Sequence, residues 1–139
     1  MGAEGAIPRS DNDRMENHAK LYYEEIRKRN SDVAAIAKNT GFSIEDVDKI
    51  KRHIFIDKHD LGMEEPERFH SNYDMAVSWQ RLIDGKNIKE MDIVLLNHEL
   101  YELNLMAKGY KYETAHNMTE LVYNYAKYTK ELDKKEGVS

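Results

Sequence analysis

The stretch DIVLLNHELYELNLM, residues 92–106, decides the fold because it is apolar on two sides when wound as a helix. At about 100° per residue, one side carries Met91, Val94, Leu95 and Leu105, and the opposite side carries Ile93, Leu96, Leu100, Leu103 and Ala107. A helix with this pattern has to be covered on both sides. The sequence therefore predicts a long helix that runs through the centre of an all-α domain.

Three polar residues stand among these leucines: His98, Glu99 and Glu102. His98 and Glu102 are one helical turn apart, so their side chains lie on the same face. Glu99 is rotated by about 100° toward the edge of that face. Polar groups are costly to bury unless something pairs with them. Two interpretations stay open: the pair holds a metal or does catalytic work, or His98 and Glu102 hydrogen-bond to each other inside the core.

The remaining periodicity and capping signals divide the chain into about six helices. The expected helices cover residues 14–30, 31–41, 43–59, 72–85, 88–109 and 112–132, with N-caps at Ser31, Ser43 and Asn72. A short connection joins the last two, which predicts an antiparallel helix hairpin at the C-terminus. Residues 1–12 are small and polar and predict a disordered leader or linker, residues 13–134 a single domain, and residues 135–139 a frayed tail.

Composition narrows the functional classes. The 139 residues include no cysteine, which excludes disulfides, thiolate metal ligands and a Cys nucleophile. The net charge of −5 gives no general affinity for polyanions, so nucleic acid is not expected as a partner without a local basic patch. No apolar run approaches the roughly 18 residues of a membrane span. We therefore expect a cytoplasmic protein with no membrane segment.

Residues 31–58 match the spacing of a helix-turn-helix unit, with Gly41 at a turn that requires a positive φ and with Val47 and Ile50 packing the second helix. A DNA reader would also need hydrogen-bond donors at the start of that second helix. This position reads SIEDVDK, and its acidic side chains would repel phosphate. The pattern favours a packing unit over a DNA binder, which stays a weaker alternative.

A metal site would need a third ligand besides His98 and Glu102. The sequence HELYE opens like the zinc-peptidase helix, but its fifth residue is Glu instead of His. A His/Glu pair still suits zinc or another divalent metal such as manganese. In the expected last helix, one side carries His116, Glu120, Tyr123 and Lys127, while Met118, Leu121, Val122 and Tyr125 are expected to face the core. If the hairpin brings the first side over His98, His116 is the natural third ligand; otherwise His116 and Glu120 form a solvated pair.

Further catalytic candidates are Glu99, His53 and His59. Glu99 or a metal-bound water would serve in acid/base chemistry, because a bound metal lowers the pKa of its water toward neutrality. His53 lies next to the core face of its expected helix, and His59 begins the longest loop. Each could equally support a neighbour, cap a helix or lie on the surface.

The blocks AKNTGFSIEDVDKIKRHIFIDKHDL, RFHSNYDMAVSWQRLIDGK and LLNHELYELNLMAKGY, followed by AHNMTE and YNYAK, resemble a helical domain of phage-related proteins. That domain is often appended to phage minor head (head-morphogenesis) proteins and is sometimes grouped with toxin-like effector domains. The resemblance covers residues 15–130. It implies a phage or prophage setting, a virion-associated location as an alternative to the cytoplasm, and phage structural proteins or the rest of a larger polypeptide as partners. It carries no defined reaction.

These observations lead to one preferred function and two alternatives. The preferred function is a metal-dependent hydrolase-like or toxin-like effector domain, with zinc or another divalent metal at His98, Glu102 and His116. Peptide, nucleic acid and nucleotide all stay open as substrates. The alternatives are a non-catalytic phage interaction module with a buried His–Glu hydrogen bond and, more weakly, a helix-turn-helix DNA binder.

Overall fold

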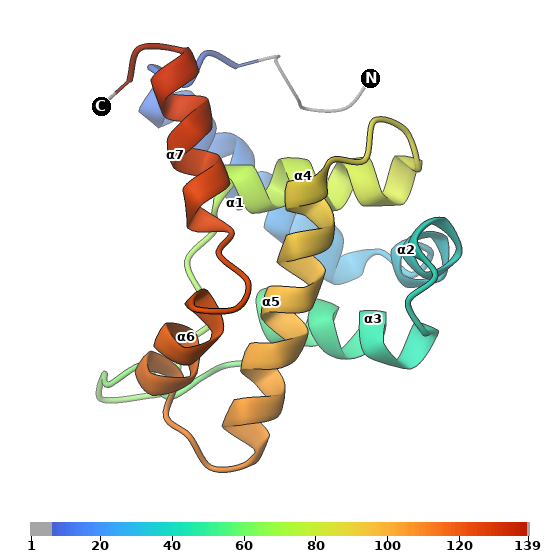
Figure 1. Ribbon diagram of the computed structural model, residues 1–139, viewed down its shortest axis with the longest axis vertical. Helices are drawn as coiled ribbons and strands as arrows, with labels where there is room; N and C mark the ends of the chain where they lie inside the picture. Colours follow the sequence, from blue (N-terminus) through green and yellow to red (C-terminus); the bar gives the residue numbers. More distant parts are fainter. Residues whose placement is uncertain (1–6, 139) are drawn as a thin grey trace.

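Helix α5 (Glu90–Ala107) runs through the middle of the computed structural model, which describes residues 7–138 (Figure 1). The all-α prediction is confirmed: the described residues form seven α-helices and no strand. None of these helices is both long and apolar enough to cross a membrane. The other elements are α1 (Asn12–Lys28), α2 (Asp32–Thr40), α3 (Ile44–Lys51), the π-helical turn η1 (Arg52–Ile56), α4 (Tyr73–Asp84), α6 (Tyr112–Glu120) and α7 (Ala126–Lys135).

Both apolar sides of α5 are covered, as the sequence predicts. On one side, Leu96 joins the main core around Trp79, and both side chains are fully buried. On the other side, Met91 and Leu95 pack against Tyr125, which immediately precedes α7. Tyr101, Asn104 and Ala107 of α5 are exposed. The polar residues His98, Glu99 and Glu102 are instead buried among other elements.

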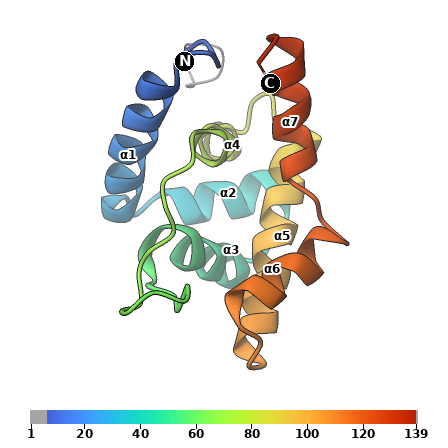
Figure 2. The ribbon, with the colours of Figure 1, turned by 90° about the vertical axis from the view of Figure 1, so that its left-hand side faces the viewer.

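Helices α2 and α3 form the predicted two-helix unit, and α2 lies between α3 and α4 (Figure 2). Gly41 ends α2 with a φ of 82°, a left-handed conformation that favours glycine. The Ser43 hydroxyl accepts the N–H of Asp46 at 3.1 Å and thereby caps α3. Val47 and Ile50 are fully buried. Ser31 precedes α2 as expected, although its side chain makes no capping hydrogen bond.

A buried ion pair fixes α2 to α3 and α4. Asp32, at the first position of α2, is fully buried. Its Oδ1 accepts a hydrogen bond from the ammonium nitrogen of Lys51 at 2.9 Å. Its other carboxylate oxygen accepts the indole N–H of Trp79 at 3.2 Å. The Lys51 ammonium also donates to the carbonyl of Arg29 at 2.6 Å. A buried charge needs such partners, because an unpaired one loses its hydration without compensation.

Helix α3 passes directly into the π-helical turn η1, where the sequence predicts that an α-helix continues to residue 59. The N–H of Asp57 donates to the carbonyl of Arg52, five residues earlier, at 2.7 Å. This wider turn directs three successive side chains, His53, Ile54 and Phe55, into the interior. Single π turns occur frequently at functional sites, and this one delivers His53 to α5.

The expected helix over residues 112–132 is wrong, because the chain leaves the helix at residues 121–125 and starts again as α7. Leu121 and Val122, expected in the core, are 89% and 54% exposed. Two features explain the break. Val122 and Tyr123 are poor helix formers because their χ1 freedom is restricted, and the Asn124 side chain accepts the N–H of Lys127 at 3.1 Å in the manner of an N-cap.

Arg9 ties the start of the described chain to two helices. Its guanidinium donates to both carboxylate oxygens of Asp74 on α4, at 2.6 and 3.0 Å, and to Asp133 on α7 at 2.8 Å. The Arg9 side chain is only 7% exposed. A guanidinium in this fork-like geometry makes stronger hydrogen bonds than a neutral donor, so it joins α4 and α7 at the end of the molecule remote from the connection between α5 and α6.

The domain boundaries differ from the expected ones at both ends. Of the expected leader, residues 1–12, the first six lie outside the described residues. Arg9 is already buried, so the folded part begins before residue 13. In the expected tail, residues 135–139, the carboxylate of Glu136 accepts the backbone N–H of Arg9 at 3.1 Å. The sequence predicts that these polar residues are solvated. In the structure, Arg9 is instead hydrogen-bonded to Asp133 and Glu136, near the other end of the chain.

We expect Asp32→Ala to lower the free energy of unfolding by about 3–5 kcal/mol, because it leaves the Lys51 ammonium buried without a counter-charge. Urea denaturation followed by Trp79 fluorescence measures the loss. The matched control is Asp48→Ala, which removes the exposed pair with Arg52 and should cost less than about 1 kcal/mol. Equal losses in the two variants would show that the buried pair contributes nothing beyond a surface pair.

Candidate functional site

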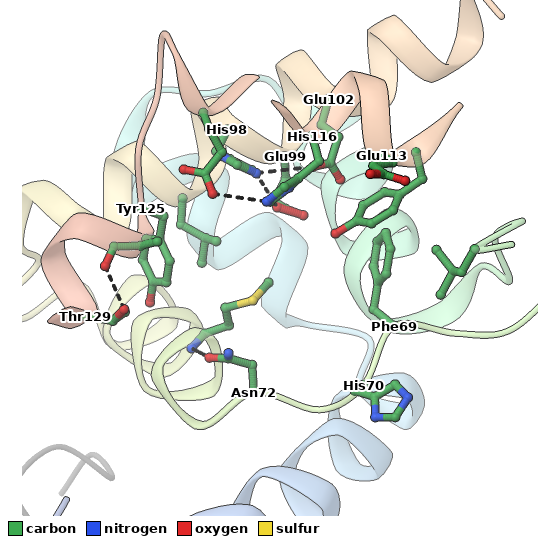
Figure 3. A pocket seen from close by; sticks show the side chains of 16 residues that line it. Phe69, His70, Asn72, His98, Glu99, Glu102, Glu113, His116, Tyr125 and Thr129 are labelled. Carbon is green, nitrogen blue, oxygen red and sulfur yellow. Dashed lines mark hydrogen bonds and ion pairs between the residues drawn. The ribbon is translucent and has the colours of Figure 1, made fainter. Parts of the chain in front are cut away.

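Glu102 is a nearly fully buried carboxylate in the interior of the domain, with 1% of its surface exposed. Three histidines approach it from three different elements: His53 from η1, His98 from α5 and His116 from α6. Figure 3 shows His98 and His116 directed at Glu102 beside a cavity. The sequence separates the first and last of these histidines by 63 residues (116 − 53), and the fold brings them together on one carboxylate.

Both carboxylate oxygens of Glu102 are engaged. Oε1 lies 2.8 Å from Nε2 of His53. Oε2 lies 2.9 Å from Nδ1 of His116 and 3.3 Å from Nε2 of His98. The atoms of His98, Glu102 and His116 that could coordinate a metal all lie within 4.8 Å of one another. The same holds for His53, Glu99 and Glu102. At this spacing each set of groups can share one metal ion.

Glu99 is a second buried carboxylate beside the first. Its oxygens lie 3.9 Å from Nε2 of His53 and 3.8 Å from Nε2 of His98, beyond hydrogen-bonding distance. Burial and the neighbouring charge of Glu102 raise the pKa of Glu99 to about 7. Glu99 is therefore the carboxyl group of the cluster that can take up and release a proton near neutral pH.

Two of the three histidines have an acceptor at their second ring nitrogen. Nδ1 of His98 lies 2.8 Å from the carbonyl oxygen of Tyr123, and Nε2 of His116 lies 3.0 Å from the carboxylate of Glu120. A carbonyl oxygen can only accept, so Nδ1 of His98 carries a proton. In the neutral ring, Nε2 then presents its lone pair toward Glu102. Metal-binding histidines are oriented in this way by an acceptor at the far nitrogen.

The break between α6 and α7 supplies the carbonyl that orients His98. In a continuous helix, the N–H of Lys127 would bond to the carbonyl of Tyr123 four residues earlier. Here that N–H bonds to the side chain of Asn124 instead. The Tyr123 carbonyl is therefore available to accept from Nδ1 of His98 at 2.8 Å.

The carboxylates and histidines of the cluster stabilise one another's charged forms. Burial alone would lower the pKa of His98, but its hydrogen bond to Glu102 and the charge of Glu99 raise this pKa to about 9. The hydrogen bond to Glu102 likewise raises the pKa of His116. Burial alone would raise the pKa of Glu102, but the hydrogen bonds from the three histidines, His116 first, hold it well below its usual range. The metal-free cluster thus keeps Glu102 ionised near neutral pH.

A cavity of about 580 Å³ opens beside the cluster. Its polar lining includes His98, Glu99, Glu102 and His116, and α7 and the segment before it contribute Thr129 and Tyr125 (Figure 3). The volume lies in the range of small-molecule sites.

Neither of the two candidate histidines from the first half of the chain lines this cavity. His53 contacts Glu102 through the other carboxylate oxygen, away from His98 and His116. His59 contacts neither carboxylate: its Nε2 donates to the carbonyl of His53 at 2.8 Å, and its ring stacks on Phe69 with centroids 4.3 Å apart. The predicted catalytic role of His59 has no support in this geometry, and we assign it instead to positioning His53.

Sequence reasoning missed the contributions of Tyr123 and Phe69. The Tyr123 contact is made by a backbone carbonyl, and its sequence signal is indirect: Asn124 stands three residues before Lys127, at the spacing of an N-cap. Phe69 lies in the long loop, and its ring also packs edge-on against His53 with centroids 5.2 Å apart. A lone aromatic residue in a polar loop gives no pattern from which its partners could be deduced.

The chain matches no family model, no curated protein and no solved structure. A functional assignment therefore has to rest on the chemistry of the cluster and its cavity.

We expect Glu102→Gln to lower the pKa of His98 from about 9 in metal-free protein, because the variant replaces the buried negative charge with a neutral amide. NMR titration of the histidine ring signals measures the change. Glu120→Gln is the matched control: it removes the carboxylate at His116 and should leave the pKa of His98 close to 9. An unchanged pKa in Glu102→Gln would refute the assignment of Glu102 as the buried counter-charge.

Proposed function

We propose that the protein is a metal-dependent hydrolase in which His98, Glu102 and His116 hold a divalent cation. The observation that carries the proposal is the convergence of three histidine nitrogens on one buried carboxylate, with an acceptor behind two of the three rings. A buried imidazole needs a partner at each of its two nitrogens, but here one carboxylate also receives histidine nitrogens from three different elements. An acceptor at the far nitrogen orients the rings of His98 and His116, so that the other nitrogen of each ring faces Glu102. Metal-binding histidines are commonly held in this way.

The donor set favours zinc over magnesium or calcium. Zinc accepts imidazole nitrogen and carboxylate oxygen together in a four-coordinate site, and catalytic zinc sites commonly use three protein ligands and leave one position for water. Magnesium and calcium prefer sites made of oxygen alone. His53, on the other oxygen of Glu102, either orients this carboxylate or becomes a further nitrogen ligand.

A bound zinc ion would supply a water of lowered pKa and would polarise the scissile bond. Glu99 is the base of the proposed reaction. Its carboxylate takes the proton from the attacking water as the water oxygen forms a bond to the electrophilic carbon or phosphorus, and it returns the proton to the leaving group as the scissile bond breaks. Glu99 lines the cavity and lies within 4 Å of both His53 and His98, and these positions support its role as the base.

A second candidate function is a non-catalytic interaction module, and one observation favours it. The two oxygens of Glu102 already accept from three histidines at 2.8–3.3 Å, so the cluster satisfies its own hydrogen bonds without an ion. In that case the cluster would join η1, α5 and α6 as a buried polar network, and phage structural proteins or the remainder of a larger polypeptide would be the partners.

The other expectations have different support. The phage setting and the toxin-like role rest on the resemblance of residues 15–130 to phage-associated domains, and we retain them as the setting in which such a hydrolase would act. No observation favours DNA binding: the first turn of α3 carries Glu45 and Asp46, whose charges oppose a phosphate backbone.

We expect tag-free protein to bind zinc with a stoichiometry of one, and His98→Ala and Glu102→Ala each to abolish that binding. Each variant removes one of three ligands. Inductively coupled plasma mass spectrometry after dialysis measures the content, and circular dichroism checks that each variant is folded. His70→Ala is the matched control, because His70 lines the same cavity without touching the cluster. Folded wild-type protein that holds no divalent metal after equilibration with zinc, manganese, cobalt and nickel would leave the interaction module as the function.

We expect Glu99→Gln to keep its metal and to lose hydrolytic activity by at least about 100-fold, the typical contribution of a general base. The amide has nearly the same shape but accepts no proton. The assay incubates metal-loaded protein with a mixed peptide library and a mixed nucleotide panel and follows new products by mass spectrometry. Wild-type activity retained in Glu99→Gln would remove Glu99 from the reaction, and loss of metal from this variant would make Glu99 a ligand.

A further inference from the structure

The cavity beside the cluster is mainly apolar away from the metal-binding residues. Its apolar lining comes from several helices and loops and includes Leu61, Phe69, Met75, Leu95, Tyr112 and Tyr125. A pocket of about 580 Å³ with such walls accommodates one large apolar group, because contact with these side chains removes that group from water.

Apart from the histidines, the charged residues around this cavity are all acidic. Glu99, Glu102, Glu113 and Glu120 line it, and no lysine or arginine is among the described residues that do. Histidines hydrogen-bond to Glu102 and Glu120. Glu113, by contrast, is exposed in the first turn of α6, and no hydrogen bond or ion pair involves its side chain among the described residues. Its carboxylate is therefore free to meet a ligand.

Phosphate binding would need other surroundings. Proteins hold phosphate with arginine, lysine or the exposed N–H groups of a helix N-terminus. The N-terminus of α6 does face the cavity at Tyr112, but Glu113 in that first turn offsets the positive end of the helix dipole. A phosphate monoester would bring its charge next to four glutamates, and two of the imidazoles that line the cavity, His98 and His116, are already paired with Glu102 and Glu120.

From this lining we infer that the cavity binds a cationic ligand with a large apolar group, such as a peptide that has a free ammonium group next to an aromatic or aliphatic side chain. The inference rests on the proposed hydrolase and names its substrate class. The apolar side chain fills the space between Phe69 and Tyr125, and the ammonium group pairs with Glu113 at the rim. Anionic phosphate esters should bind to this lining less tightly than such a cation.

Three probes with the same phenyl group test the inference by NMR titration of the full chain: phenylalaninamide (cationic), N-acetylphenylalaninamide (neutral) and phenyl phosphate (anionic). Each titration is run once after chelator treatment and once with zinc. We expect phenylalaninamide to bind about fivefold more tightly than its acetylated form, as one exposed ion pair allows. This preference should shrink as salt is added. The shifted backbone signals should include those of Ala126 and Thr129, which line the cavity.

Variants assign the preference to its cause. Glu113→Gln should make the affinities of the cationic and neutral probes equal. Glu25→Gln, at an exposed position of α1 outside the cavity, should leave the fivefold ratio intact. Leu61→Ala should weaken the cationic and neutral probes by similar factors, because both insert the same ring. A ratio unaffected by Glu113→Gln, or tighter binding of phenyl phosphate in either form of the protein, would overturn the inference.

The two forms of the protein separate this inference from the proposed function. A preference for the cationic probe in chelator-treated protein supports the inference even if the protein binds no metal, in which case the hydrolase proposal alone fails. If zinc binds at His98, Glu102 and His116 while the two amides bind equally, the substrate class fails and the metal site stands.

Discussion

The buried charge of Glu102 is the constraint on which the arrangement of this domain depends. A carboxylate in the interior loses its hydration, and only charged or hydrogen-bonding partners can replace that loss. The chain supplies three histidines from η1, α5 and α6, and each of these elements has to be in place before the carboxylate is satisfied. The packing of three separate segments therefore depends on the need of one buried carboxylate for partners. This holds whether the histidines contact Glu102 directly or share a metal ion with it.

The irregular parts of the fold serve the same requirement. A regular helix in place of η1 would not direct His53, Ile54 and Phe55 inward together, and a continuous helix through residues 121–125 would occupy the Tyr123 carbonyl. Both departures from regular geometry occur at segments that contact the cluster. Local deviations from ideal structure are expected where a protein positions functional groups, because the most regular backbone is rarely the one that brings the required groups together.

The sequence predicted the all-α class, the central helix and the shared face of His98 and Glu102, because these follow from periodicity within one helix. It left open whether His116 joins them or pairs with Glu120 in solvent. It could not place His53 on Glu102, since 49 residues separate them and helical periodicity says nothing about contacts over that distance. It also misassigned Leu121 and Val122, because an apolar pattern that continued the helical period hid the capping signal of Asn124. The burial of Arg9 depends on carboxylates of α4 and α7, and no local pattern encodes that contact.

The carbonyl that orients His98 belongs to the backbone of Tyr123, so this hydrogen bond tolerates substitution of the residue that provides it. A side-chain acceptor can be lost in one substitution, but any residue at position 123 brings a carbonyl oxygen with it. The proton on Nδ1 of His98 is thus encoded by the path of the chain between α6 and α7 and not by the identity of the residue there. A substitution at position 123 keeps this hydrogen bond, although it removes the ring contact of Tyr123 with Tyr101. An insertion or deletion within residues 121–125 would move the carbonyl away from His98.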